Sequence, residues 1–379
     1  MKTIIIGGGV FGLTAAIELA TRGHAVTLLD PGPLPHPLAE STDISKVVRI
    51  DYGADADYTA LGEAAIAGWK TWNAGWPRPL FHETGVAFLS RTPMQPGGFE
   101  HDSYELLVSR GHALQRLTAA DIPTWFPAYR PGALVDGYFN PVGGWAESGA
   151  VIAKLAAEAR MSGVTIIANR AVERITASGV DDLTAELVVV CAGAWVTQLL
   201  PELEDSIRAS GQPVFHLRPS ERSLFEASRF PVFGADIART GYYGFPATSD
   251  GIVKIANHGA GEPGINEGDL AVRPDQDAAL RLFLRTVFPA LADAPIVHRR
   301  VCVYADTLDG HFWIAPHPDR PNLVVATGGS GHAFKFAPVL GALIADIALG
   351  IPHPLAHKFR WRPELVAPTR GDAARHADR

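Results

Sequence analysis

Three glycines near the N-terminus have the spacing of a turn that binds the pyrophosphate of a dinucleotide. Gly7, Gly9 and Gly12 complete a G-x-G-x-x-G pattern. In such a pattern the first glycine permits a tight turn, the second lets the phosphates approach the backbone, and the third allows close packing of helix on strand. Asp30 lies 18 residues beyond Gly12, where a carboxylate can accept hydrogen bonds from a ribose diol. These residue types therefore predict dinucleotide binding.

The flanking sequence indicates the elements that would position these glycines. The isoleucines at 4–6 predict a strand that is buried on both faces of a parallel sheet. Residues 13–22 carry apolar side chains at helical spacing and stop at Gly23, and residues 25–29 predict a second strand. The N-terminus of the helix would then face the phosphates. This order favours a bound dinucleotide over a glycine-rich turn without a ligand.

Two groups of basic residues could bind an anion. Lys46 and Arg49 would point to one side on a helical turn but diverge on an extended segment, so a solvated basic pair on a loop stays open. His332 and Lys335 share a turn if their segment is helical. A buried ammonium needs a partner, which a substrate carboxylate would supply, whereas Lys335 could also snorkel to solvent.

Cys302 and Lys254 each lie in an apolar, strand-like segment. A single cysteine in such a strand is usually an inert small hydrophobe. An alternating strand would point Lys254 to one face and its neighbours Val253 and Ile255 to the other. The pattern alone therefore favours a solvent-facing lysine on a half-exposed strand.

Composition restricts the class of protein. The chain has 379 residues, enough for about two domains, and its 47% hydrophobic and 19% charged residues are ordinary for a soluble globular enzyme. A net charge of −7 without a basic run argues against a nucleic-acid partner.

No segment approaches the ~18 uncharged apolar residues that span a membrane. Cys191 and Cys302 cannot form a disulfide framework, which predicts a reducing cytoplasm. His311 and His317 lack metal-ligand spacing, so we expect no metal.

Three separated segments have the βα pattern of a nucleotide domain. The N-terminal one is described above, and the other two contain a helix over 148–162 with strands over 164–168 and 187–190, and a strand from 323 followed by a helix over 338–349. Strand-like, turn-rich stretches lie between them, so a second domain would be inserted twice. The polar C-terminal tail, 366–379, is predicted to be disordered.

Six motifs in sequence order resemble the monomeric sarcosine oxidase family of FAD-dependent amine oxidases, within the wider D-amino-acid-oxidase-like class. They are the N-terminal glycine motif, Lys46-Val-Val-Arg-x-x-Tyr-Gly53, Tyr242-Tyr-Gly-Phe-Pro246, Lys254 with His258, Cys302-Val-Tyr304 and Gly331-His-Ala-Phe-Lys-Phe336. The resemblance implies a mixed α/β (α+β) fold with a Rossmann-like FAD-binding domain and an inserted substrate domain built on an antiparallel sheet. The FAD-binding domain would comprise 1–84, 146–215 and 301–365, and the substrate domain 85–145 and 216–300.

The resemblance also implies residue roles. Cys302 matches the cysteine that bonds through its sulfur to the flavin ring, which would make the FAD covalent. Arg49 and Lys335 match the two cations that hold the substrate carboxylate. Lys254 matches the lysine that contacts the reactive flavin nitrogen through water and promotes reaction with oxygen. Residues matched to the walls of the cavity over the ring are His258, Tyr243 and His332. The expected cofactor-binding residues are Gly7, Gly9, Gly12, Asp30, Lys46, Cys302, Gly331, His332 and Lys335.

Two departures from sarcosine oxidase concern the substrate. Lys46 stands where that family has arginine, and the segment 43–49 is more similar to fructosyl amino acid and saccharopine oxidases. Gly234 falls near a position where sarcosine oxidase has a methionine against its substrate. Both departures suggest a substrate larger than sarcosine.

The expected activity is oxidation of the C–N bond of an amino acid by a cytoplasmic, monomeric flavoprotein oxidase. A secondary amine is favoured, with an N-alkyl, glycated or cyclic amino acid as substrate, oxygen as the second substrate, and an imine and hydrogen peroxide as products. Alternatives are a biosynthetic tailoring oxidase of a cyclic amine or imine, a flavin-dependent amino acid dehydrogenase, an NAD(P)-dependent dehydrogenase and a nucleotide-sensing module without catalysis.

Overall fold

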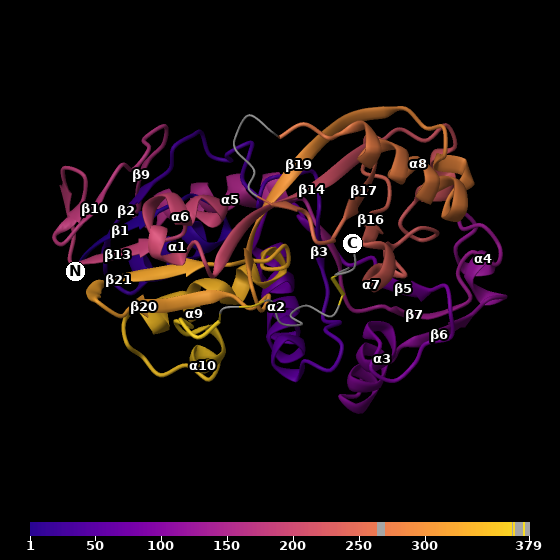
Figure 1. Ribbon diagram of the computed structural model, residues 1–379, viewed down its shortest axis with the longest axis horizontal. Coiled ribbons are helices and arrows are strands. Elements are labelled where there is room, and N and C mark those ends of the chain that lie inside the picture. The colour runs from indigo at the N-terminus through magenta and orange to yellow at the C-terminus, as the bar shows by residue number, and fades with distance from the viewer. Residues whose placement is uncertain (264–269, 366, 368–373, 376–379) are drawn as a thin grey trace.

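The chain forms two lobes side by side, each built around its own large sheet (Figure 1). The computed structural model describes residues 1–379 except 264–269, 366, 368–373 and 376–379. Two long antiparallel strands, β14 (Ile207–Leu217) and β19 (Ile296–Thr307), pair along their length and contribute to both lobes. Ile207 packs in the core of the first lobe, whereas Phe215 packs in the core of the second.

The first lobe contains a six-stranded sheet. Its order is β20 (Trp313–His317), β21 (Arg320–Thr327), β13 (Leu187–Val190), β1 (Lys2–Ile6), β2 (Ala25–Leu29) and β9 (Thr165–Ile167), all parallel except the edge strand β20. One face is covered by α1 (Val10–Thr21), α5 (Ser148–Met161) and α9 (Ala337–Ala348). Ile5 packs beneath these helices, while Ile4 and Ile6 pack on the opposite face with residues that include Val196 of α6 (Val196–Leu199). Strand 4–6 is therefore buried on both faces, as predicted.

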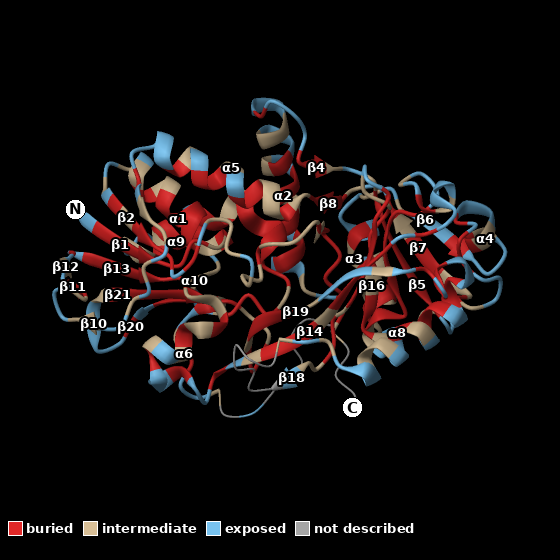
Figure 2. Cartoon of the chain, turned by 90° about the horizontal axis from the view of Figure 1, so that it is seen from above, coloured by how far each residue is buried: buried red, intermediate tan, exposed pale blue. Residues whose placement is uncertain are grey.

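The second lobe contains a nine-stranded, largely antiparallel sheet. Besides β14 and β19 it comprises β18 (Glu262–Pro263), β17 (Val253–Asn257), β16 (Tyr242–Gly244), β15 (Val232–Ala235), β5 (Val86–Ser90), β7 (Asp136–Asn140) and β6 (Gln115–Thr118). Among the described strands of this second sheet, only β5 and β15 pair in parallel. Helix α8 (Pro274–Val287) places Leu280 and Leu284 on this sheet, against Val253 and Ile255. Figure 2 shows the strands of both sheets as mainly buried, with exposed residues on loops and outer helix faces.

The chain also forms two small sheets and several further helices. Two three-stranded sheets consist of β3 (Lys46–Val48), β8 (Gly144–Ala146) and β4 (Phe81–His82), and of β10 (Ile175–Thr176), β11 (Gly179–Val180) and β12 (Leu183–Thr184). The remaining α-helices are α2 (Ala56–Gly75), α3 (Phe99–Ser109), α4 (Asp121–Trp125), α7 (Ile237–Thr240) and α10 (Ala356–Phe359). Within the described part of the chain, no helix has the length and apolar character needed to cross a bilayer.

The predicted fold class is confirmed, with a parallel sheet in one lobe and a large antiparallel sheet in the other. The domain boundaries stay a prediction, and those at 215/216 and 300/301 fall inside β14 and β19. Most of the tail that was predicted to be disordered lies outside the described residues. Of its described residues, Ala374 is fully buried, and Arg375 forms an ion pair of 2.5 Å with Asp306.

Candidate active site

The turn between β1 and α1 contains approaches that only glycine allows. A Cβ on Gly7, whose φ is +105°, would lie 2.3 Å from the carbonyl oxygen of Cys191. A Cβ on Gly12 would lie 1.8 Å from the carbonyl oxygen of Gly7, so this glycine lets the helix pack on the strand. Gly9 is the N-cap of α1, and a Cβ there would meet only the Ser41 Oγ, at 3.3 Å. The backbone at Gly9 is thus open to a ligand.

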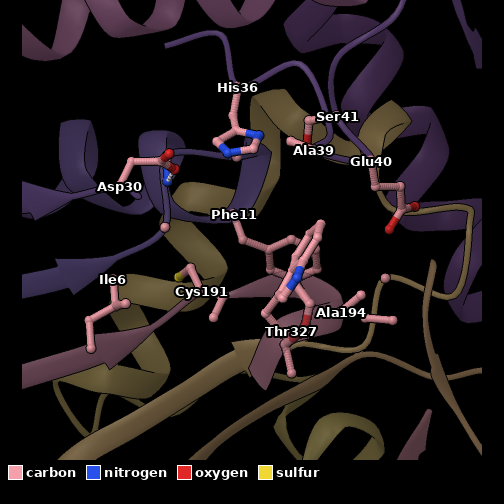
Figure 3. A pocket seen from close by; sticks show the side chains of 18 of the residues that line it. Ile6, Phe11, Asp30, His36, Ala39, Glu40, Ser41, Cys191, Ala194 and Thr327 are labelled. Atoms are coloured by element: carbon pink, nitrogen blue, oxygen red, sulfur yellow. Dashed lines mark hydrogen bonds between the residues drawn. The ribbon is translucent and has the colours of Figure 1, made fainter. Parts of the chain in front are cut away.

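A cavity of about 580 Å³ opens at the carboxyl ends of β1, β2, β13 and β21 (Figure 3). Gly7 and Gly9 line it, whereas Gly12 lies behind them. The Asp30 and Glu40 side chains lie on opposite sides of this cavity, with Phe11 between them (Figure 3). The volume is within the range of about 300–1,000 Å³ typical of ligand sites.

Asp30 holds the glycine turn in place. Its carboxylate accepts hydrogen bonds from the backbone N–H groups of Gly8 (2.7 Å) and Gly32 (3.0 Å). Burial raises the pKa of Asp30, against the lowering effect of these two N–H groups. Each carboxylate oxygen keeps a further lone pair for a ribose hydroxyl. The exposed helix N-terminus, the open backbone at Gly9 and this carboxylate together fit a dinucleotide such as FAD.

A second, smaller cavity adjoins the first, and Phe334 lines both. It gathers seven of the predicted site residues, from segments up to 289 positions apart: Lys46, Arg49, Tyr243, His258, Gly331, His332 and Lys335. Its other walls are apolar and include Val86, Phe88, Val232 and Ile237. The cavity has a volume of only about 40 Å³, but its lining of cations and apolar side chains matches the chemistry of an anionic substrate with a hydrophobic body.

Arg49 and Lys335 meet at one aromatic ring. The Arg49 guanidinium carbon lies 4.4 Å from the ring centroid of Tyr52, and the Lys335 Nζ donates a hydrogen bond of 2.9 Å to the Tyr52 hydroxyl. Lys335 is 2% exposed, so it does not snorkel to solvent. Lys46 and Arg49 do not diverge, although Lys46 is in a strand, because Arg49 lies beyond the end of β3 and both line the same cavity.

His332 continues this hydrogen-bonded chain. The Lys335 Nζ also donates to the His332 carbonyl oxygen (2.6 Å), which shows that these residues share a turn at η6 (Phe334–Phe336). The His332 Nε2 lies 2.9 Å from the Gly310 carbonyl oxygen and its Nδ1 lies 3.1 Å from the Tyr52 hydroxyl. Since a carbonyl only accepts, Nε2 carries a proton and donates it to Gly310, while Nδ1 lies within hydrogen-bond distance of the Tyr52 hydroxyl.

Lys254 is buried in the sheet and does not face solvent, which overturns the interpretation from the strand pattern alone. It is 1% exposed, and its Nζ lies 2.8 Å from an Asp43 oxygen and 2.6 Å from the Ser45 carbonyl oxygen. The alternation was correct, since Val253 and Ile255 pack on the opposite face against α8. Both faces of β17 are covered here, because the segment 43–45 lies over the face that carries Lys254. The lysine itself lines neither cavity.

Cys302 lies on β19, a strand that lines the dinucleotide cavity. On β19, Val303 and Ala305 line the dinucleotide cavity, whereas Cys302 points the other way and is 1% exposed. The Lys46 Nζ lies 3.6 Å from the Cys302 Sγ. Burial lowers the pKa of Lys46, but Cys302, Tyr243 and the nearby carboxylates together raise it. Cys302 is therefore not in a purely apolar environment, as an inert packing cysteine would be.

Several residues of the site had no role assigned from sequence. They are Glu40, Asp43, Tyr52, Phe88 and His216. Spacing could have indicated Tyr52, in Arg-x-x-Tyr, and Asp43, in Asp-x-x-Lys. Phe88 could not be found this way, because its position depends on the pairing of β5 with β15.

Phe88 also bears on the size of the substrate. A Cβ on Gly234 would lie 2.7 Å from the Phe88 ring, so this ring fills the space beside the glycine. The glycine at 234 therefore does not by itself enlarge the cavity, contrary to the inference from sequence.

The similarity of the chain to known proteins is extensive. A family model described as FAD dependent oxidoreductase matches residues 2–347. Monomeric sarcosine oxidase from Bacillus sp. (strain B-0618) is 27% identical over 361 residues, which cover 91% of this chain and 91% of that protein. N-methyl-L-tryptophan oxidase from Salmonella typhimurium is 30% identical over 366 residues, covering 92% and 94%. The crystal structure of fructosamine oxidase (Amadoriase II) from Aspergillus fumigatus superposes with a TM-score of 0.85 at 26% identity, over 100% of this chain and 93% of that chain.

Proposed function

The chain belongs to the FAD-dependent oxidoreductase family, so we propose that it oxidises the C–N bond of a secondary amine that carries a carboxylate. The products would be an imine and hydrogen peroxide. One observation carries this proposal: Arg49 and Lys335 converge on Tyr52 in a cavity that adjoins the dinucleotide cavity. Arg49 and Lys335 are both buried cations, and a substrate carboxylate that reaches them would be bound by charge-assisted hydrogen bonds.

The names of the similar proteins support an amine substrate. Sarcosine and N-methyl-L-tryptophan are N-methyl amino acids, and fructosamine is a glycated amine. The nitrogen in all three is secondary. An N-alkyl, glycated or cyclic amino acid is therefore the substrate class that we propose for this chain.

The dinucleotide cavity would hold FAD. The glycine turn and the N-terminus of α1 would bind the pyrophosphate, and Asp30 a ribose. When bound, FAD accepts two electrons and a hydrogen from the C–H bond beside the nitrogen and passes the electrons to oxygen. We propose that Cys302 would hold the flavin covalently through its sulfur. The bond would replace the S–H bond and one C–H bond of a ring methyl group, with loss of two protons, and the two electrons released would pass through the flavin to oxygen. The Lys46 ammonium, 3.6 Å from the sulfur, supports this because it favours the attacking thiolate.

The chain's own residues would act by positioning and electrostatics. Arg49 and Lys335 would fix the carboxylate, and this would orient the C–H bond relative to the ring. Val86, Phe88 and Ile237, which are at most 5% exposed, would exclude water from the cavity. Lys254 would provide a fixed positive charge that stabilises the anion formed when oxygen takes its first electron.

The experiment is a panel of N-methyl, glycated and cyclic amino acids mixed anaerobically with the purified flavoprotein. We expect bleaching of the flavin by one class, and stoichiometric hydrogen peroxide after oxygen is admitted. The same amines without their carboxylate should not bleach the flavin. Bleaching followed by slow reaction with oxygen would identify a dehydrogenase instead, and no bleaching by any secondary amine would refute the proposal.

Location and assembly are further proposals. Both cysteines are buried free thiols, which supports a reducing compartment such as the cytoplasm. A monomer is proposed from the similarity to a monomeric sarcosine oxidase.

A further inference from the structure

Three basic side chains lie in one row across the second sheet. Lys254 of β17 is directly opposite His216 of β14, and His216 is directly opposite His298 of β19. The rings of the two histidines have centroids 4.9 Å apart. A lysine that is buried in such a row needs an anion close by if it is to stay charged.

Asp43 supplies that anion from outside the sheet. One carboxylate oxygen lies 2.8 Å from the Lys254 Nζ, and the other lies 3.0 Å from the His216 Nε2. The three side chains are 2%, 1% and 8% exposed for Asp43, Lys254 and His216. The carboxylate thus joins two members of the row within the protein interior.

The backbone around Asp43 is fixed. Its carbonyl oxygen accepts hydrogen bonds from the Ser148 Oγ (2.8 Å) and the Gly149 N–H (2.8 Å), at the start of α5. Arg300 donates a hydrogen bond of 2.6 Å to the carbonyl oxygen of the preceding residue, Thr42. Ser45, two residues further on, accepts the second hydrogen bond of Lys254. The anchored segment 42–45 therefore fixes the position of the Lys254 ammonium group.

Burial and the neighbouring charged groups set the pKa of Lys254. Burial lowers the pKa of Lys254 to about 8, against the raising effect of Asp43, and Lys46 lowers it further. Burial alone would raise the pKa of Asp43, but Lys254, His216 and Lys46 hold it well below its usual range. Asp43 is therefore the anion that keeps a buried lysine protonated near neutral pH. The other titratable groups that act on Lys254 and Asp43 are Lys46, His216 and Cys302, with His298 and Arg300 beyond His216.

We propose that Asp43 is a positioning residue that fixes Lys254 as a cation beside the flavin, and that His216 holds the Asp43 carboxylate in the orientation this requires. The proposal rests on the proposed function, in which the charge of Lys254 assists the reaction with oxygen. Asp43 and His216 contact neither cavity and act through the lysine.

The direct test is the protonation of Lys254 in the oxidised holoprotein. The chain has only seven lysines, so NMR of protein labelled at the lysine side chain can follow Lys254 through a pH titration, with Lys254→Arg for assignment. We expect Asp43→Asn to lower the pKa of Lys254 by one unit or more. Asp346→Asn, which removes a partly exposed partner of Arg22 in the first lobe, should leave the titration unchanged.

The second measurement is the reaction of photoreduced flavin with oxygen as a function of pH, which requires no amine. Asp43→Asn should lower the rate constant at pH 8 about tenfold and move the midpoint of the pH profile to lower pH. His216→Gln, which keeps a donor to Asp43, should retain most of the rate, whereas His216→Phe should not. The two His216 variants test the same proposal if Asp43→Asn does not fold.

The outcomes separate the two proposals. An unchanged Lys254 titration in both Asp43→Asn and His216→Phe would overturn the positioning role. A shifted titration with an unchanged oxygen rate would support the positioning role and overturn the proposed part of Lys254 in the oxidase reaction.

Discussion

Lys335 donates a hydrogen bond of 2.9 Å to the hydroxyl of Tyr52. This contact joins the C-terminal motif, residues 331–336, to the motif of residues 46–53. The Arg49 guanidinium carbon lies 4.4 Å from the centroid of the same tyrosine ring. The centroids of the Phe88 and Phe99 rings lie 5.8 and 5.6 Å from that carbon. Tyr52 thus contacts both cations, and a carboxylate that reached both would be recognised by geometry as well as by charge.

We expect Arg49→Ala to weaken substrate binding about 30-fold or more. Loss of one partner of a desolvated charge pair typically costs about 2–5 kcal/mol, and about 1.4 kcal/mol corresponds to tenfold. The dissociation constant can be measured from the change of the flavin spectrum under anaerobic conditions. An amine without a carboxylate should bind wild type and variant equally. If Arg49→Ala and Lys335→Ala both keep the wild-type affinity, neither cation binds the carboxylate.

Tyr52→Phe should have a smaller effect on the same measurement. The variant keeps the ring beneath Arg49 but removes the hydroxyl that joins Lys335 to His332. A single hydrogen bond is worth about 0.5–1.5 kcal/mol, so affinity should fall by up to roughly tenfold. Tyr104→Phe is a control, because Tyr104 lies at Tyr138, outside the cavity. A larger loss in Tyr52→Phe than in Arg49→Ala would contradict this ranking of the two contacts.

The covalent flavin bond can be assigned with the two cysteines of the chain. Cys191 lines the dinucleotide cavity, and Cys302 lies on β19 beside two residues that line it. Only Cys302 has an ammonium at its sulfur, whereas burial raises the pKa of the Cys191 thiol. Since the thiolate is the reactive form, acid-precipitated wild type and Cys191→Ala should stay yellow, and Cys302→Ala should precipitate white. Lys46→Met should slow formation of the bond. Flavin that is released from wild type by acid would exclude a covalent link.

Lys254→Met should slow the reaction of reduced flavin with oxygen about 10²–10³-fold, with little change in reduction by substrate. One preorganised charge at a developing anion typically contributes a factor of this size. Because burial lowers the pKa of Lys254 to about 8, the charge is present below that pH and lost above it. The oxygen rate of wild type should therefore fall as pH rises through about 8, and that of Lys254→Met should not.

Stopped-flow measurement of each half-reaction separates the two effects. Lys70→Met removes a lysine whose side chain is 54% exposed and should leave both half-reactions unchanged. An oxygen reaction of Lys254→Met as fast as that of wild type would refute the role.

The elements that were predicted well are those with a strong local signal. The isoleucine run, the glycine spacing and the stop signal at Gly23 predicted β1, α1 and β2, because strand and helix periods differ and glycine marks the turn. Lys254 could not be placed this way. Strand alternation gives two faces but does not reveal that a segment about 210 residues earlier covers one of them.

Partners that are distant in sequence account for the remaining errors. Phe88 fills the space at Gly234 because β5 and β15 pair in parallel, and no local pattern encodes that pairing. The domain boundaries stay a prediction, and β14 and β19 continue through two of them. A resemblance that spans many short motifs is informative here because it carries such long-range information.

A buried carboxylic acid in the second lobe should make stability depend on pH. Glu100 lies in the first turn of α3 and is 8% exposed. Burial, reinforced by the nearby Asp236 carboxylate, raises the pKa of Glu100 to about 7 from 4.5. Below pH 4.5 this acid is protonated in both the folded and the unfolded state, so it does not affect the free energy of unfolding.

Between pH 4.5 and 7 the unfolded state loses this proton first, so the free energy of unfolding should fall as pH rises, by about 3 kcal/mol in total for a shift of about 2.5 units. Glu100→Gln cannot ionise. The variant should therefore match wild type near pH 4 and exceed it by up to about 3 kcal/mol at pH 8, measured by urea unfolding. Glu105→Gln, on the exposed face of α3, should show no such gain. Equal stability of Glu100→Gln and wild type at pH 8 would mean that Glu100 ionises as readily in the folded state as in the unfolded one.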